Sequence, residues 1–147
     1  MYTDGKIGWT STSRGWGALA GPERSRVFGD LFRVYYRLLL SDRLEGRVVN
    51  AIDESSVQIT DAAGQTTNVE FDPRTHLLKR VSYDLQQVGG APVYTDEVYD
   101  DFRDVGGIKV PFKIVINQGV TRFSDVVVKE YKINTGLSPL ELARRPQ

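Results

Sequence analysis

The chain has 147 residues, with 19 basic and 19 acidic side chains, one histidine and no cysteine. This length suits a single domain with a buried core, and the lack of cysteine excludes disulfides and thiolate ligands. The balanced charge gives no overall basic footprint of the kind a nucleic-acid binder needs, although it leaves a local basic patch open, and no apolar run reaches the roughly 18 residues of a membrane span.

The N-terminal region is predicted to be a strand from Lys6 to Ser11 that enters a glycine-rich loop from Ser11 to Gly21. The loop lacks the Lys-Ser or Lys-Thr pair of a phosphate-binding loop. We interpret it as a mobile connection. The alternative is a lid over the mouth of a sheet, with Trp16 as its apolar tip and Leu19 beside it.

The stretch from Pro22 to Leu40 is the one long segment with helical spacing, and proline suits its first turn. Its apolar residues recur at intervals of three and four: Val27, Phe28, Leu31, Phe32, Tyr35, Leu38 and Leu39. Three arginines share the opposite face: Arg26, Arg33 and Arg37. We interpret this face as solvated, with Arg26 pairing with Asp30. The alternative is a face that meets acidic lipid headgroups or an acidic partner.

The rest of the chain alternates apolar and polar residues in short runs separated by turn residues, which predicts seven strands. Their expected ranges are 47–53, 56–61, 66–72, 78–87, 93–102, 108–117 and 121–133. Pro111 predicts an edge position or a bulge, and the broken alternation at Ser124 and Asp125 predicts a β-bulge. A short terminal helix is expected from Ser138 to Arg144.

These elements predict the fold class. A helix with so wide an apolar stripe is not stable alone, so a sheet must cover it. We therefore expect a single α+β domain over residues 1–147. Its strongly curved antiparallel sheet, an open half-barrel of about seven strands, would wrap around one main helix. An uncovered edge strand makes pairing with a second copy a candidate assembly.

The sequence gives little support for a catalytic site or a metal-binding site. His76 is the single histidine and lies beside a turn with Asp72, where a catalytic triad would need an oriented serine partner. A run of acidic residues offers oxygen ligands for calcium, but its spacing is not that of a calcium loop. The run comprises Asp96, Glu97, Asp100, Asp101 and Asp104. We interpret it as a solvated face that pairs with Lys109 and Lys113.

Several motifs resemble one known group, the LolA-like superfamily of periplasmic lipoprotein carriers and outer-membrane lipoprotein-sorting proteins. Residues 3–9, TDGKIGW, resemble its Asp-Gly-Lys-x-x-Trp strand, and residues 100–112, DDFRDVGGIKVPF, resemble its most specific hairpin. Residues 71–75, FDPRT, and 133–137, INTGL, are similar to a turn and a terminal segment of the group. Whole carriers have a further helix and strands before the first motif, so we expect this chain to be a fragment of a longer protein.

The resemblance implies a non-catalytic domain, periplasmic or associated with the outer membrane, that needs no cofactor or metal. It would bind an apolar or acylated ligand between helix and sheet, with contact to a membrane surface as a further expectation. The implied lining residues are Phe28, Leu31, Phe32, Tyr35, Leu39, Phe112 and Ile114. The residue pattern alone favours a core role for the helix stripe.

Two other functions stay open. One is a protein-interaction or spacer module without a ligand cavity, at the C-terminus of a larger envelope protein, because related domains follow some insulinase-like zinc peptidases. The other is a hydrolase, which the residues support least.

Overall fold

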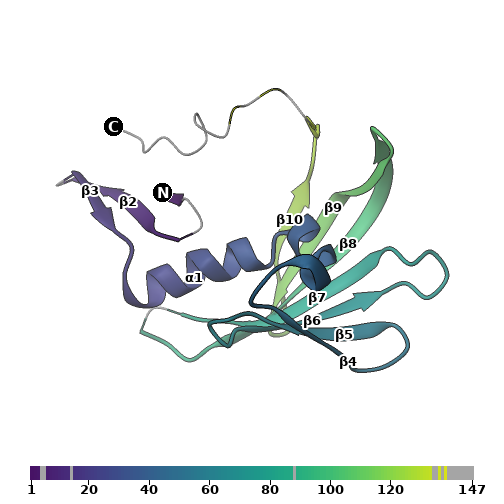
Figure 1. Ribbon diagram of the computed structural model, residues 1–147, viewed down its shortest axis with the longest axis horizontal. Coiled ribbons are helices and arrows are strands. Elements are labelled where there is room, and N and C mark those ends of the chain that lie inside the picture. Colours follow the sequence, from purple (N-terminus) through teal and green to yellow (C-terminus); the bar gives the residue numbers. More distant parts are fainter. Residues whose placement is uncertain (4–5, 14, 88, 134–135, 137, 139–147) are drawn as a thin grey trace.

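The computed structural model describes residues 1–3, 6–13, 15–87, 89–133, 136 and 138. Within this part of the chain, a small sheet precedes two α-helices, and a large sheet follows them (Figure 1). The small sheet has the order β1 (Tyr2–Thr3), β2 (Gly8–Thr12), β3 (Gly15–Ala18). The helices are α1 (Gly21–Phe32) and α2 (Tyr35–Leu39), followed by the 3-10 turn η1 (Ser41–Arg43).

The large sheet has seven antiparallel strands in the order β10-β9-β8-β7-β6-β5-β4, so each strand pairs with its neighbours in sequence. Its strands are β4 (Val48–Ala51), β5 (Ser56–Thr60), β6 (Thr66–Phe71), β7 (Leu78–Leu85), β8 (Val93–Val105), β9 (Ile108–Gln118) and β10 (Thr121–Val127). The short turns predicted from the sequence explain this order, because consecutive strands joined by short turns pair with each other.

The predicted fold class is wrong. Strands make up 49% of the protein and helices 15%, so the fold is mostly β, and the large sheet is neither closed nor strongly curled. The helices lie over one face of an open sheet instead of inside a half-barrel (Figure 1). The reason is that little of the helical segment needs covering: residues 21–26 are exposed, and Gly29 and Phe32 are the buried residues of α1.

The single helix predicted from Pro22 to Leu40 is also wrong, because the segment breaks after Phe32. Val34 adopts an extended conformation with φ −52° and ψ 125°, and α2 starts at Tyr35. Neither glycine nor proline marks this break. Tertiary contacts explain it: the Tyr35 hydroxyl donates to the Lys109 carbonyl at 3.2 Å, and its ring centroid lies 5.9 Å from that of Tyr99.

The predicted loop from Ser11 to Gly21 is a hairpin for most of its length. Trp16 of β3 lies opposite Ser11 of β2, and the hairpin sits at the N-terminal end of α1 (Figure 1). Leu19 is 5% exposed and donates its backbone N–H to the Gly8 carbonyl at 2.7 Å. A Cβ at Gly8 would lie 2.5 Å from Leu19 Cδ1, so the missing side chain leaves room for this leucine.

Other local predictions meet varied outcomes. The bulge in the last strand lies between Arg122 and Ser124, next to the predicted position. Pro111 lies past the last β9–β10 pair, Val127↔Lys113, and its carbonyl accepts the Tyr131 hydroxyl at 2.7 Å. The Val128 N–H still donates to the Phe112 carbonyl at 2.9 Å, and Pro111 itself lies opposite Phe102 of β8. Pro111 is therefore in an interior strand, and the predicted edge position is wrong. Most of the predicted terminal helix, residues 139–144, lies outside the described residues.

The hydrophobic core lies between the helices and one face of the large sheet. Phe32 and Leu38 enter it from the helices, where they are 4% and 3% exposed. The buried sheet residues of the core are Ile59, Val69, Leu78, Val81, Tyr83 and Tyr99. One inward row runs across the sheet in direct register: Val57, Val69, Val81, Glu97 and Ile116. Glu97 is the one carboxylate in that row, which makes its surroundings a candidate site.

Arg47 joins the helices to the start of the large sheet. Its guanidinium donates to the carbonyls of Arg37 at 2.8 Å and Phe32 at 3.3 Å, and to the Ser41 hydroxyl at 2.8 Å. The carbonyls at a helix C-terminus have no partner within the helix, and a cation there is favourable. Arg47 therefore caps α1 and α2 together.

We predict that Arg47→Met lowers the free energy of unfolding by about 2 kcal/mol, because charged hydrogen bonds to the helix ends are lost while the aliphatic stem stays. Urea denaturation of the purified domain measures this change. The matched control is Arg43→Met, since Arg43 is 77% exposed and lies 3.9 Å from Asp42. That substitution should cost less than about 0.5 kcal/mol. Equal effects of the two substitutions would contradict the capping role.

Candidate functional site

The C-terminal end of α1 rests on the middle of the large sheet. The Arg33 guanidinium lies 3.8 Å from the centroid of the Tyr83 ring on β7, the central strand of the seven. Arg33 is 7% exposed and pairs with Asp30 at 3.0 Å. This contact divides the helix-side face of the sheet, and a cavity lies on each side of α1.

The larger cavity, which we name the helix groove, has a volume of about 960 Å³. Phe28, Leu31 and Phe32 of α1 form its apolar part, and the loop between β5 and β6 borders it opposite the helix. Phe28 and Leu31 are half-buried, so their side chains are accessible from the groove. The helix groove thus has an apolar strip that the core does not cover.

Basic side chains surround this strip. Lys6, Arg24, Arg37 and Arg47 line the helix groove together with two acids, Glu45 and Asp61. The Arg24 guanidinium lies 4.3 Å from the Phe28 ring centroid, and that of Arg47 lies 4.8 Å from the Phe32 ring centroid. Four cations against two carboxylates leave the groove with an excess of positive charge next to its apolar strip.

The smaller cavity, which we name the tyrosine pocket, has a volume of about 270 Å³ and lies on the β8–β9 side of α1. Its lining residues are Asp30, Arg33, Val34, Tyr35, Glu97, Tyr99 and Ile114. The Glu97 carboxylate accepts the hydroxyl of Tyr83 at 2.8 Å and that of Tyr99 at 2.6 Å. This pair of bonds satisfies both oxygens of an inward-facing acid.

The two phenols are held in their neutral form. Burial raises the pKa of Tyr83 and of Tyr99, and the adjacent Glu97 carboxylate raises both further. A neutral phenol can donate a hydrogen bond, and both phenols donate to the Glu97 carboxylate. The network is suited to holding structure and offers no phenolate nucleophile.

The structure separates the seven predicted ligand-binding residues. Phe28, Leu31 and Phe32 share the helix groove, whereas Tyr35 and Ile114 line the tyrosine pocket. Phe112 is 8% exposed, and its ring packs edge-on against that of Tyr131 with centroids 5.3 Å apart. Leu39 is 41% exposed and lies in neither cavity. The contact between Arg33 and Tyr83 causes this separation, because it lies between the two cavities.

The predicted lid residues lie in the small hairpin. Trp16 is half-buried on β3, and Leu19 is buried against Gly8. Neither belongs to the lining of the helix groove or the tyrosine pocket. A lid role for them stays a prediction.

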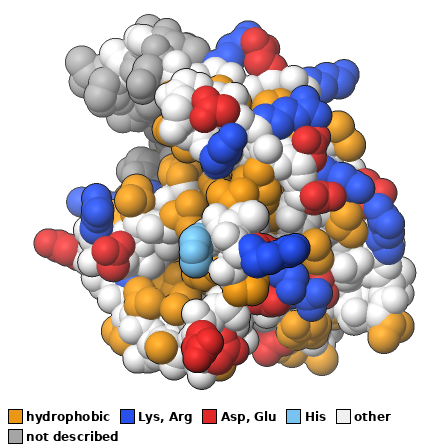
Figure 2. All heavy atoms as spheres, turned by 90° about the vertical axis from the view of Figure 1, so that its right-hand side faces the viewer, with side chains coloured by type: hydrophobic (Ala, Val, Ile, Leu, Met, Phe, Trp, Pro, Cys, Tyr) orange, Lys and Arg blue, Asp and Glu red, His pale blue; other side chains and the backbone are white. Residues whose placement is uncertain are grey.

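His76 lies in an exposed turn, at φ 57°, on a face that mixes basic, acidic and hydrophobic side chains (Figure 2). The Asp72 carboxylate accepts the backbone N–H groups of Arg74 and Thr75, at 3.0 and 2.8 Å, so it closes the turn. These bonds hold the pKa of Asp72 below its usual value. The Ser55 hydroxyl nearby donates to Asp53 at 3.2 Å. The described contacts therefore assemble no triad around His76.

The acidic run divides between the two faces of β8. Asp100 and Asp104 lie opposite Lys113 and Lys109 in the register, as predicted. Asp101 pairs with Arg103, whereas Asp96 is 8% exposed and Glu97 faces the helices. Among the described residues, no three His, Asp or Glu side chains gather as metal ligands would.

Sequence reasoning named Arg37 as a candidate contact for an acidic partner but missed Lys6, Arg24 and Arg47 of the helix groove, and it missed the inward position of Glu97. Arg33 was expected on a solvated helix face with Arg26 as the partner of Asp30, yet it is buried and holds Asp30 itself. The signal for Glu97 was present: it alternates with Tyr99 at the period of a strand, so both point to one face. No comparable signal marks Arg47, whose partners follow from the break between α1 and α2.

We predict that the unfolding free energy falls as the pH rises above about 10, because the unfolded chain then loses tyrosine protons that the folded chain keeps. Below that pH the contribution of Tyr83 and Tyr99 is fully present. The loss should reach about 1.4 kcal/mol per pH unit for each tyrosine. Urea unfolding in the alkaline range measures the slope, which Tyr83→Phe with Tyr99→Phe should flatten. Tyr36→Phe is the control, since Tyr36 is 65% exposed. A slope that the double substitution leaves unchanged would refute this account.

Comparison with protein-family models found no matching model, and comparisons with curated proteins and with solved structures found no match. The resemblance to LolA-like carriers therefore stays a prediction from the motifs. Within the described residues, neither helix has the length and apolar character needed to cross a membrane.

Proposed function

We propose that this domain binds an amphipathic molecule, without catalysis, in the helix groove. The main support for this proposal is that one cavity of about 960 Å³ combines an apolar strip with an excess of basic side chains. Phe28, Leu31 and Phe32 form the strip. Small-molecule sites are commonly cavities of about 300–1,000 Å³ lined by apolar side chains with a few polar groups. An acyl chain with an acidic headgroup matches both parts.

The apolar chain supplies most of the binding free energy in this proposal. Each methylene group removed from water contributes about 0.8 kcal/mol, and the half-buried side chains of Phe28 and Leu31 lie on the same side of α1 as the buried Phe32. The core is already complete without a ligand, because Phe32, Leu38 and the buried sheet residues form one cluster with exposures of 9% or less.

The headgroup supplies specificity. Arg24 and Arg37 border the apolar strip, and Arg37 is exposed, so its guanidinium can reach an acidic group in solvent. Attraction between exposed charges weakens as salt increases. An acid should therefore bind more tightly than the alcohol of equal chain length, and the difference should shrink at high salt.

The carrier role and the periplasmic or outer-membrane location rest on the LolA-like resemblance, in which the ligand is an acyl chain of a lipoprotein. In this proposal the acyl chain binds in the helix groove beside α1, and not in a cavity inside a half-barrel.

The second candidate is a protein-interaction module, favoured by the exposed edge of the large sheet. On the edge strand β10, Phe123 is 65% exposed and Val127 is 71% exposed. An edge strand with exposed apolar residues offers pairing to a strand of another chain. This function needs no cavity, so the groove experiment separates the two candidates.

We predict that the wild-type domain raises the fluorescence of N-phenyl-1-naphthylamine and that dodecanoate displaces the probe. Phe28→Ser should weaken dodecanoate binding at least about tenfold, because it removes apolar contact from the groove. Leu39→Ser is the matched control, since Leu39 lies outside both cavities. The proposal fails if the probe shows no enhancement, or if the two substitutions act equally.

We further predict that Arg24→Gln with Arg37→Gln removes the preference for dodecanoate over dodecanol while leaving dodecanol binding unchanged. Arg26→Gln is the control, because Arg26 is an exposed arginine of α1 outside the groove lining. Competition titrations at low and high salt measure the preference. An unchanged preference in the double variant would show that these arginines do not recognise the headgroup.

A further inference from the structure

The face of the large sheet opposite the helices carries a continuous line of polar side chains. The strand register places one residue from each of the seven strands side by side: Asn50, Gln58, Asn68, Ser82, Asp96, Asn117 and Arg122. We name this line the polar row. It is displaced by one residue from the inward row of valines, so its members point away from the core.

Exposure to water alone does not explain the polar row. One face of an antiparallel sheet is commonly solvated and therefore polar. However, asparagine and aspartate are depleted in strands, where threonine and other β-branched residues are favoured. Four of the seven members are nevertheless asparagine or aspartate, namely Asn50, Asn68, Asp96 and Asn117. Because these residue types are unfavourable in strands, their presence here indicates that the side-chain amides have a role other than stabilising the sheet.

Two pairs of members of the polar row are joined by hydrogen bonds, and the row as a whole is nearly neutral. Gln58 Nε2 donates to Asn68 Oδ1 at 3.2 Å, and Asn117 Nδ2 donates to Asp96 Oδ2 at 3.0 Å. Arg122 pairs with Asp125, and Asp96 is 8% exposed, so the accessible part presents amides and hydroxyls with little net charge. Such a surface both donates and accepts hydrogen bonds.

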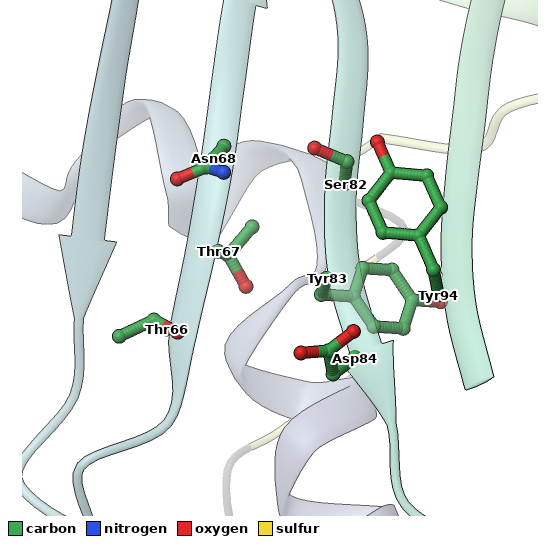
Figure 3. Close-up of a pocket in the computed structure, with 7 residues that line it drawn as sticks. All are labelled: Thr66, Thr67, Asn68, Ser82, Tyr83, Asp84 and Tyr94. Atoms are coloured by element: carbon green, nitrogen blue, oxygen red, sulfur yellow. The ribbon is translucent and has the colours of Figure 1, made fainter. Parts of the chain in front are cut away.

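Two small cavities open beside the centre of the polar row, and both are lined by Asn68, Ser82 and Tyr94. Their volumes are about 80 Å³ and 210 Å³. Figure 3 shows the first, where Asn68 and Ser82 lie on adjacent strands and Tyr94 stands beside Ser82, with the helices behind the sheet. Tyr94 is 50% exposed, so an aromatic ring borders the polar row at this point.

The same cavity holds a polar group without a partner. Thr67 lines it and is 1% exposed, and the Thr67 Oγ1 atom has no hydrogen-bond partner among the described residues. A buried hydroxyl without a partner costs free energy. Thr67 pairs with the core residue Ile59 and alternates with Asn68 along β6, so its side chain lies on the core face and is not a member of the polar row.

We propose that the polar row binds an uncharged, polyhydroxylated chain, an oligosaccharide, laid across the strands. Sugar hydroxyls both donate and accept, as the amides do, and the apolar face of a sugar ring can pack on Tyr94. Neighbouring strands are about 4.8 Å apart, so the row offers partners at regular intervals along such a chain. Near-neutrality disfavours a polyanion, and the polar side chains disfavour an apolar protein partner.

The test is calorimetric titration of the wild-type domain with cellohexaose, maltohexaose and chitohexaose, with a heparin hexasaccharide as the charged comparison. At least one neutral hexasaccharide should bind with a dissociation constant of about 1 mM or tighter, and salt should not weaken it. Tyr94→Ala, and separately Asn68→Ala with Asn117→Ala, should each weaken binding about tenfold. Tyr36→Ala is the matched control, since Tyr36 is 65% exposed and lies on the helix side.

Three results would overturn the proposal: no binding of any neutral hexasaccharide at about 1 mM, salt-sensitive binding of heparin alone, or equal loss in Tyr94→Ala and Tyr36→Ala. Urea unfolding of each variant shows whether a loss of binding reflects a loss of folding. If the alanine variants unfold, Asn68→Ser with Asn117→Ser keeps a short polar side chain at each position and must show the same weakening. The outcome is independent of the helix groove, which lies across the sheet from the polar row.

Discussion

The stacking of the Arg33 guanidinium on the Tyr83 ring determines where the helical layer crosses the sheet. The contact is 3.8 Å long and nine-tenths buried, and Asp30 supplies the opposite charge at 3.0 Å. A buried cation without such partners would be strongly unfavourable, so the position of α1 over β7 is tightly constrained. Because β7 is the central strand, the sheet extends beyond the helix on both sides. The helix groove and the tyrosine pocket are consequences of covering a wide sheet with one narrow helix.

The two faces of the sheet follow from a single register. The inward row of Val57, Val69 and Val81 meets the helices, and the polar row, one residue along each strand, meets solvent. A slip of one residue at any strand would exchange the two sets of side chains, so the core fixes the alignment of the amides. Any surface that uses the polar row therefore depends on the valines of the core face for its alignment. The Glu97 carboxylate departs from the apolar pattern of the inward row, and the Tyr83 and Tyr99 hydroxyls compensate for it.

Local patterns were enough to predict the strands and their turns. Alternation in Val57 and Ile59 marks β5, and Asp72 followed by Pro73 marks a turn that the Asp72 carboxylate closes. Local patterns did not predict the break between α1 and α2, the low curvature of the large sheet or the fold class. Helical spacing continues through Val34, and the break depends on contacts of Tyr35 with Lys109 and Tyr99, which are distant in sequence. Curvature depends on how much apolar helix surface must be covered, and the exposed first turns of α1 reduce that amount.

The residues of the candidate site were even harder to predict from local sequence patterns. Periodicity identifies the apolar stripe of the helix, but it does not tell which of its residues face the sheet and which border an open cavity. Phe32 does both: it is 4% exposed, belongs to the core and lines the groove. Arg47 likewise borders the groove while it caps both helices, so its removal would disturb folding and binding together. Phe28 and Arg37 differ, because both line the groove without belonging to the core. A ligand-binding role can therefore be separated from a structural one at these positions, where the groove extends beyond the contacts that hold α1 to the sheet.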